Sequence, residues 1–152
     1  MWAMDHTPDS ESEARALITQ LNLAPHPEGG WYRQTWIDTD APAGHRASGT
    51  AILFLLAAGE VSHWHRIDAV EIWHFHAGAP LILSMAETAA GPARHLRLGP
   101  DLGAGDLPQG IVPKGHWQAA RSTGGWSLVG CTVSPGFRFD GFELAAPGFD
   151  IR

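Results

Sequence analysis

Short apolar or alternating runs, each closed by glycine or proline, follow one another through most of the chain after residue 30. The 152 residues include 18 Gly and 11 Pro, and so many chain breaks disfavour long helices. Short β-prone runs separated by turn signals are typical of a β-sandwich or barrel. About eight strands are expected, at residues 31–36, 51–56, 61–65, 71–76, 80–85, 94–98, 109–120 (broken by a Pro-x-Gly turn) and 126–133. The aromatic tail at 134–144 is expected to lie over the sheet.

One amphipathic helix is expected before the first strand. Asp9 or Ser10 is a suitable N-cap, and two glutamates follow in the first turn, near the positive end of the helix dipole. Apolar residues then recur at helical spacing: Ala14, Leu17, Ile18 and Leu21. The chain is therefore expected to form a single all-β domain with one N-terminal helix over residues 9–152, preceded by a flexible lead-in at 1–8.

Charge and cysteine content exclude several classes of function. The formal net charge is −6 and Lys114 is the only lysine, so no basic surface for nucleic acid or an anionic membrane is expected. Cys131 is the only cysteine, which rules out an internal disulfide and fits a reducing compartment. It lies in an apolar run and is interpreted as a core residue. With no signal-peptide pattern and no spanning apolar run, a cytoplasmic location is expected.

The run VSHWHRIDAVEIWHFH, which begins at residue 61, carries the densest pattern of ionisable side chains. Side chains alternate across a strand, so His63 and His65 are expected on one face. In the next strand, Glu71 shares a face with Trp73 and Phe75. Two imidazoles and a carboxylate that converge from neighbouring strands suit a metal site or an acid–base site.

Other ionisable residues have more than one interpretation. His74 and His76 have the parity opposite to Glu71 and are assigned to the outer face or a subunit interface. His26 is interpreted as a structural residue of a proline-rich turn. Glu28 and Arg33 flank the first strand, where they are either surface charges or groups that reach a polar ligand.

Four blocks in order resemble the cupin-5 family, small single-domain cupins of largely unassigned function. The blocks are HPEGGWYRQT (26–35), SHWHRIDAVEIWHFHAGAPL (62–81), VPKGHWQAAR (112–121) and LVGCTVSPGFRFDGFELA (128–145). The resemblance implies a cupin jelly-roll, a double-stranded β-helix barrel, and this agrees with the expected strands. It also implies a small-molecule ligand and a homodimer.

The resemblance implies a possible metal site. Carried over from metal-bearing cupins, the ligands of one divalent ion would be His63, His65, Glu71 and Gln118. Such a set suits iron, manganese, nickel or zinc. Gln118 stands where the family pattern has histidine, and His116 has the same strand parity and is an alternative ligand. On this interpretation the protein is a metal-dependent dioxygenase or isomerase.

A second resemblance, to cupin-type sugar epimerases, implies metal-independent chemistry with His65 as general base beside Glu71. The ligand would be a small polar molecule, plausibly carbohydrate-like. The residues assigned to ligand binding are Arg33, Glu28, Trp73, Phe75, His116, Trp117 and Gln118. A third interpretation is a ligand-binding or sensory module without turnover.

Overall fold

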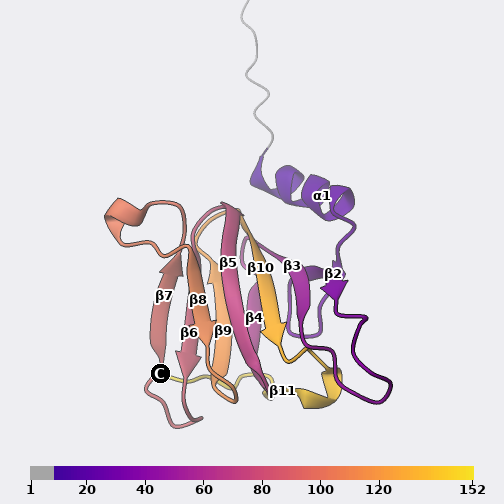
Figure 1. The fold of residues 1–152 in the computed structure, drawn as a ribbon. Coiled ribbons are helices and arrows are strands. Elements are labelled where there is room, and N and C mark those ends of the chain that lie inside the picture. Colours follow the sequence, from indigo (N-terminus) through magenta and orange to yellow (C-terminus); the bar gives the residue numbers. More distant parts are fainter. Residues whose placement is uncertain (1–8) are drawn as a thin grey trace, which may run out of the picture.

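The computed structural model describes residues 9–152, so the expected lead-in at 1–8 lies outside the described residues. Two antiparallel sheets form the body of the molecule (Figure 1). The first sheet has the spatial order β1 (Ala24–Pro25), β2 (Trp31–Ile37), β3 (Thr50–Ala57), β10 (Trp126–Ser134), β5 (Val70–Gly78) and β8 (Gln109–Val112). The second has the order β11 (Phe142–Leu144), β4 (Val61–Ile67), β9 (Trp117–Ser122), β6 (Leu81–Ala86) and β7 (Arg94–Leu98). The expected all-β jelly-roll with one N-terminal helix is confirmed.

The helix α1 (Ser10–Gln20) lies at one end of the first sheet (Figure 1). The Asp9 side chain caps it by accepting a hydrogen bond from the Ser12 backbone N–H at 2.7 Å. Its apolar stripe packs against Leu55 of β3, as the helical spacing predicted. Across residues 9–152, no helix is long and apolar enough to cross a membrane.

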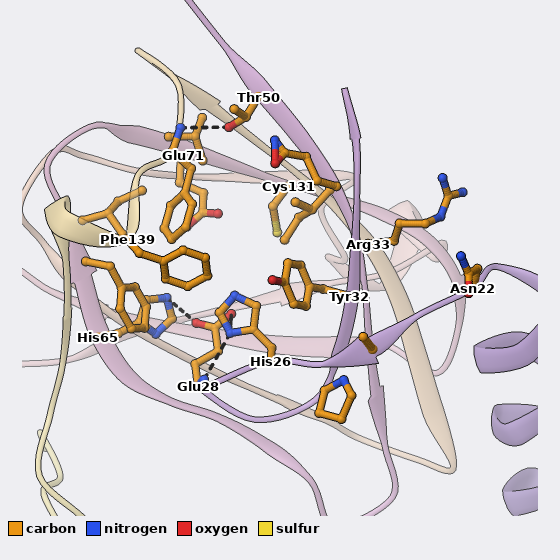
Figure 2. Close-up of a pocket in the computed structure, with 18 residues that line it drawn as sticks. Asn22, His26, Glu28, Tyr32, Arg33, Thr50, His65, Glu71, Cys131 and Phe139 are labelled. Atoms are coloured by element: carbon orange, nitrogen blue, oxygen red, sulfur yellow. Dashed lines mark hydrogen bonds and ion pairs between the residues drawn. The ribbon is translucent and has the colours of Figure 1, made fainter. Parts of the chain in front are cut away.

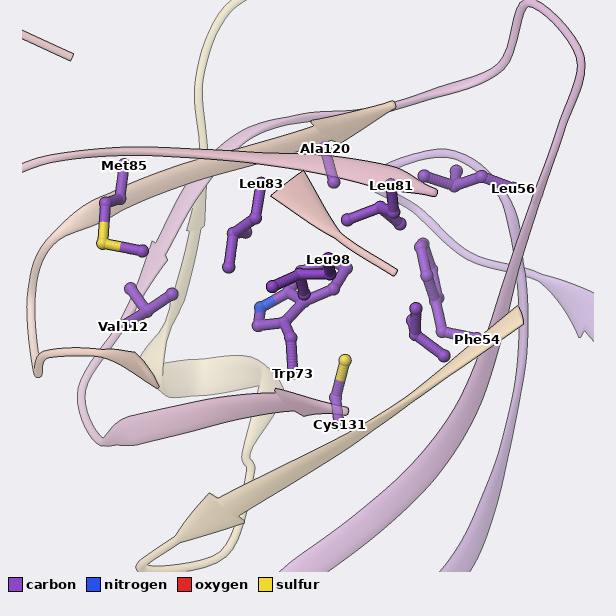
Figure 3. Close-up of a cluster of buried hydrophobic side chains, with 11 residues drawn as sticks. Phe54, Leu56, Trp73, Leu81, Leu83, Met85, Leu98, Val112, Ala120 and Cys131 are labelled. Atoms are coloured by element: carbon purple, nitrogen blue, oxygen red, sulfur yellow. The ribbon is translucent and has the colours of Figure 1, made fainter. Parts of the chain in front are cut away.

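An apolar core fills one half of the space between the sheets, and a cavity occupies the other half (Figures 2 and 3). Along β3, Phe54 lies in the core, whereas Thr50, on the same face, lines the cavity. Along β5, Trp73 lies in the core and Glu71 lines the cavity. The core comprises Phe54, Leu56, Trp73, Leu81, Leu83, Met85, Leu98, Val112, Ala120, Val129 and Cys131. The inward faces of the strands are therefore apolar at one end and partly polar at the other.

The expected run at 109–120 becomes two strands in different sheets. β8 pairs with β5 in the first sheet, whereas β9 pairs with β4 and β6 in the second. The Pro113–Gly115 turn is thus a crossover between the sheets rather than an interruption within one strand. Gly115 has a φ of +77°, a conformation that glycine adopts at little cost.

A β-bulge in β4 changes which of its residues face inward. Ser62 pairs with Ala120 and His65 pairs with Gln118, so two residues of β4 oppose one residue of β9. The extra residue puts Ser62 and His65 on the same face, although they are three positions apart. The expectation that His63 and His65 share a face is therefore wrong, because simple alternation does not continue through a bulge.

The aromatic tail closes the cavity end of the molecule. It forms a short 3₁₀ helix, η2 (Phe139–Gly141), and then β11, which pairs with β4 at the edge of the second sheet. A second 3₁₀ helix, η1 (Leu102–Ala104), lies in the loop between β7 and β8. The tail was expected to lie over the sheet, but it instead lines the cavity and joins the second sheet as its edge strand, β11.

Candidate functional site

The candidate site is a cavity of about 350 Å³ between the two sheets, at the end covered by the aromatic tail (Figure 2). A cavity of this size fits a small organic molecule. Its polar and ionisable lining residues are Asn22, His26, Glu28, Tyr32, Arg33, Gln34, Thr50, His65, Glu71 and Cys131. Its apolar lining residues are Ala24, Pro25, Ile52, Ile67, Val133, Phe137, Phe139 and Phe142.

Glu28 and His65 form a buried ion pair at this cavity. His65 Nε2 lies 2.7 Å from Glu28 Oε2, and the two residues are 2% and 7% exposed. His65 Nδ1 lies 2.7 Å from the His63 carbonyl oxygen, which only accepts, so Nδ1 carries a proton. Nε2 faces a carboxylate oxygen at a distance that requires a proton on one of the two groups. In the charged form of the pair, both ring nitrogens of His65 carry a proton and Glu28 is a carboxylate.

The pKa values favour that charged form. Burial opposes the charge on His65, but Glu28, together with Glu71 and the His63 carbonyl oxygen, outweighs it and raises the pKa of His65. Burial likewise opposes the charge on Glu28, but His65 outweighs it and lowers the pKa of Glu28. Both shifts favour an imidazolium that faces a carboxylate.

Glu71 is a second buried carboxyl group in the same cavity. Burial, and then the negative charge of Glu28, raise the pKa of Glu71 from its ordinary value of 4.5 to about 7. Glu71 Oε1 accepts a hydrogen bond from Gln118 Nε2 at 2.8 Å. Gln118 Oε1 in turn accepts from Trp73 Nε1 at 2.7 Å, and this fixes the orientation of the amide. Glu71 is thus held in place and divides between its two protonation states near pH 7.

The segment before β2 carries Glu28 and His26 into the cavity through a two-glycine turn. Gly29 has a φ of +109°, and a Cβ atom there would lie 2.0 Å from the Val61 carbonyl oxygen. The Glu28 carbonyl oxygen accepts from the His63 backbone N–H at 2.8 Å and ties the turn to β4. Only glycine fits such a close approach of two backbones.

His26 was interpreted from the sequence as a turn residue, but it also lines the cavity. Its Nδ1 accepts a hydrogen bond from the Glu28 backbone N–H at 3.1 Å, so this nitrogen carries no proton. Burial lowers the pKa of His26, which keeps the ring neutral. The paired glycines that follow were the sequence signal for this tight, buried turn.

Aromatic rings form the part of the wall beside the two histidines, His26 and His65. The Phe137, Phe139 and Phe142 rings contact one another edge to face, with centroids 4.9–6.1 Å apart. The His65 ring packs against Phe142 at 5.4 Å, and the His26 ring packs against Tyr32 at 4.4 Å. The sequence placed this aromatic tail over the sheet but did not assign it to the ligand site.

The structure brings three of the predicted site residues together and sets a fourth at the rim. Glu28, His65 and Glu71 line the cavity with their side-chain ends buried. Arg33 also lines it, but its guanidinium points outward beside Asn22 (Figure 2). Its Nε donates to the Leu21 carbonyl oxygen at 2.7 Å.

Three other predicted residues lie behind the cavity wall. Gln118 is completely buried and contacts Glu71 rather than the open space. Trp73 is 1% exposed within the apolar core (Figure 3), and Phe75 packs against that core. These residues lie on the apolar-core side of the cavity, where they pack behind the residues that line it.

The remaining three lie outside the cavity. Trp117 precedes inward-facing Gln118, so it lies on the opposite face, 5.3 Å from the Phe149 ring. His116 lies in the turn before β9 and does not line the cavity. Because of the bulge, His63 lies away from it, with its Nε2 donating to the Ala146 carbonyl oxygen at 2.9 Å.

The metal ligands implied by the family resemblance do not fit one ion. His63 does not line the cavity that holds His65 and Glu71. Gln118 presents its NH₂ group to Glu71, and its only ligand atom, Oε1, accepts from Trp73. Among residues 9–152, no group of three or more His, Cys, Asp or Glu side chains is arranged to hold a metal ion.

Comparisons with known proteins agree with the architecture. Residues 15–145 match the Cupin_5 family model, described as Cupin superfamily (DUF985). A crystal structure of a protein from Shewanella oneidensis is 46% identical, with a TM-score of 0.82 over 88% of this chain and 84% of that chain. A hypothetical protein from Leishmania major is 32% identical, with a TM-score of 0.79 over 90% of this chain and 89% of that chain.

A variant of Bacillus subtilis oxalate decarboxylase matches at 11% identity, with a TM-score of 0.60. The match covers 79% of this chain and 29% of that chain, and likeness at such identity shows the fold alone. No curated protein matches the chain.

Proposed function

The chain belongs to the Cupin_5 family of the cupin superfamily, a small-molecule-binding fold, and on this premise we propose that its cavity binds a small polar ligand and transfers protons on it. The reaction class would be a metal-independent isomerisation or epimerisation of a ring-shaped, carbohydrate-like compound. The observation that carries the proposal is that two acid–base groups whose pKa values are raised, His65 and Glu71, line one cavity.

The two groups have different proposed roles. Glu71, with a pKa of about 7, is the base. Near neutral pH its carboxylate form is populated, and the raised pKa makes that carboxylate a stronger proton acceptor than an ordinary glutamate. His65 is the proton donor, because its ion pair with Glu28 favours the imidazolium. This reverses the role expected from the sequence, in which His65 was the base.

The proposed step is a proton abstraction from carbon next to a carbonyl group. Glu71 takes the proton, the C–H electron pair forms the carbon–carbon double bond of an enol, and the carbonyl oxygen takes the proton of His65. Glu28 is a positioning residue, since it holds the imidazole and stabilises its charge. Protonation of the neighbouring carbon by Glu71, with His65 regaining a proton from the hydroxyl group that becomes the new carbonyl, completes an isomerisation. Protonation of the original carbon on its opposite face completes an epimerisation.

Solvent deuterium exchange tests the proposed step. Aldoses, ketoses and other small carbonyl compounds are incubated with the protein in D₂O, and the C–H signals next to the carbonyl are followed by NMR. We expect deuterium incorporation in at least one compound that binds, and loss of about a hundredfold or more of the exchange rate in Glu71→Gln. Glu87→Gln changes an exposed carboxylate outside the cavity and is the matched control.

Binding without exchange would contradict the proton-transfer proposal. It would favour the third interpretation of the sequence, a ligand-binding or sensory module. Exchange that survives in Glu71→Gln would also contradict the assignment of the base.

We also propose that the protein is a cytoplasmic homodimer. The support for the dimer is that several large apolar side chains of the first sheet are more than a third exposed, among them Trp36, Val70 and Ile111. The single, buried cysteine supports a reducing compartment. Light scattering at micromolar concentration tests the dimer, and cell fractionation tests the location.

A further inference from the structure

The charges at the cavity balance only while Glu71 is protonated. Glu28 and Glu71 contribute two buried carboxyl groups, and His65 supplies one imidazolium between them. His26 is neutral, since its Nδ1 accepts a hydrogen bond and burial disfavours its charge. Among the described lining residues, Arg33 is the only other cation, and its guanidinium points away from the carboxylates (Figure 2).

The carboxylates also keep unused acceptor capacity. Glu28 Oε2 is buried and lies 2.7 Å from His65 Nε2, and the Ser62 hydroxyl is the other donor group that acts on the Glu28 carboxylate. Glu71 Oε1 accepts a hydrogen bond from Gln118 Nε2, and the Cys131 thiol also acts as a donor to the Glu71 carboxyl group. A carboxylate offers about four acceptor positions, and buried acceptors left without donors are costly.

We infer that the ligand of this cavity carries a protonated nitrogen, an ammonium group that lies between the Glu28 and Glu71 carboxylates. Such a group supplies up to three N–H donors together with the positive charge that balances an ionised Glu71. A neutral polyol supplies donors but leaves the second carboxylate uncompensated, and an anion adds a third negative charge. The inference rests on the proposed function only in placing the ligand in this cavity.

The aromatic wall suits the same ligand. The faces and edges of Phe137, Phe139 and Phe142 surround the space next to His65. Aromatic faces attract cations and pack against the C–H groups that adjoin an ammonium nitrogen. The cavity therefore combines carboxylate acceptors with aromatic rings, as sites for organic cations do.

The positive charge also serves the proposed reaction. An ammonium group beside Glu71 offsets the repulsion from Glu28 and favours the ionised carboxylate, which is the form that accepts a proton. Binding of the ligand would thus itself convert Glu71 to the ionised form that acts as the base.

Three probes that share one ring and differ in charge test the inference: cyclohexylammonium, cyclohexanol and cyclohexanecarboxylate. Their dissociation constants are measured at pH 7.5 by titration calorimetry and by protein NMR shifts, with shifts at His65 and Cys131 locating the probe. We expect cyclohexylammonium to bind about tenfold or more tightly than cyclohexanol, and the carboxylate to bind most weakly.

Glu71→Gln keeps the size of the side chain and an acceptor for Gln118 while removing the charge. We expect it to reduce the preference for cyclohexylammonium to about threefold or less without weakening cyclohexanol. Glu87→Gln, with an exposed carboxylate outside the cavity, should leave the preference unchanged.

Equal or tighter binding of cyclohexanol, tighter binding of the carboxylate, or no binding of cyclohexylammonium would overturn the inference. A preference that survives in Glu71→Gln would do the same. Failure of the deuterium-exchange test would contradict proton transfer but would not alter a measured charge preference, so the two proposals fail separately.

Discussion

Replacing Glu71 with glutamine should stabilise the protein, and the gain should depend on pH. The raised pKa means that folding disfavours the Glu71 carboxylate, through burial and the charge of Glu28. The unfolded chain loses this proton near pH 4.5 and the folded chain near pH 7, so the free energy of unfolding falls as the pH rises between these values. Each pKa unit corresponds to about 1.4 kcal/mol, so the total loss is about 3 kcal/mol.

Glutamine has no such titration and can still accept the hydrogen bond from Gln118. We therefore expect wild type and Glu71→Gln to have similar stability at pH 4.5, with the variant ahead by about 3 kcal/mol at pH 8. Urea denaturation of both proteins at pH 4.5, 6, 7 and 8 measures this difference in the free energy of unfolding. Groups that titrate in both proteins contribute equally and cancel in the difference. A difference that does not grow with pH, or that favours wild type at pH 8, would refute the reasoning.

Two further predictions concern the turn that carries Glu28. Glu28→Gln leaves His65 without its carboxylate, so we expect a loss of about 3 kcal/mol in the free energy of unfolding at pH 6, and unchanged stability in urea denaturation would contradict the buried ion pair. Gly29→Ala drives a Cβ atom into the Val61 carbonyl oxygen and should cost about 3 kcal/mol or more. Gly44 has a φ of +80° but open space around the position of a Cβ atom, so the control Gly44→Ala should cost only about 1 kcal/mol. Similar shifts in melting temperature for the two alanine variants would argue against the backbone contact at Gly29.

The sequence was sufficient to predict the fold because its local signals agree with one another. The capped helix, the short β-prone runs and the glycine–proline turns all favour one compact β architecture, and the family resemblance identifies its jelly-roll form. The Pro113–Gly115 turn was located correctly, but its role as a crossover was not. A turn signal shows where a strand ends, and pairing partners at long range decide which sheet the next strand joins.

The candidate site was predicted in part, for reasons that particular residues make clear. Glu71 and Gln118 lie on inward faces because β5 and β9 keep regular alternation there. His63 was misplaced because the bulge in β4 adds one residue, and such an insertion leaves no simple mark in the alternation. His26 escaped assignment because its burial depends on a turn that docks against β4, a contact between segments far apart in the sequence.

The most direct test of the account is the protonation state of the two proposed acid–base groups. Glutamate labelled with ¹³C at the carboxyl carbon is titrated by NMR, with Glu71→Gln assigning the signal, and ¹⁵N-labelled histidine reports the ring of His65. The account predicts a midpoint near 7 for Glu71 and, at pH 7, a proton on both ring nitrogens of His65. A Glu71 midpoint near 4.5, or a neutral His65 at pH 7, would contradict it.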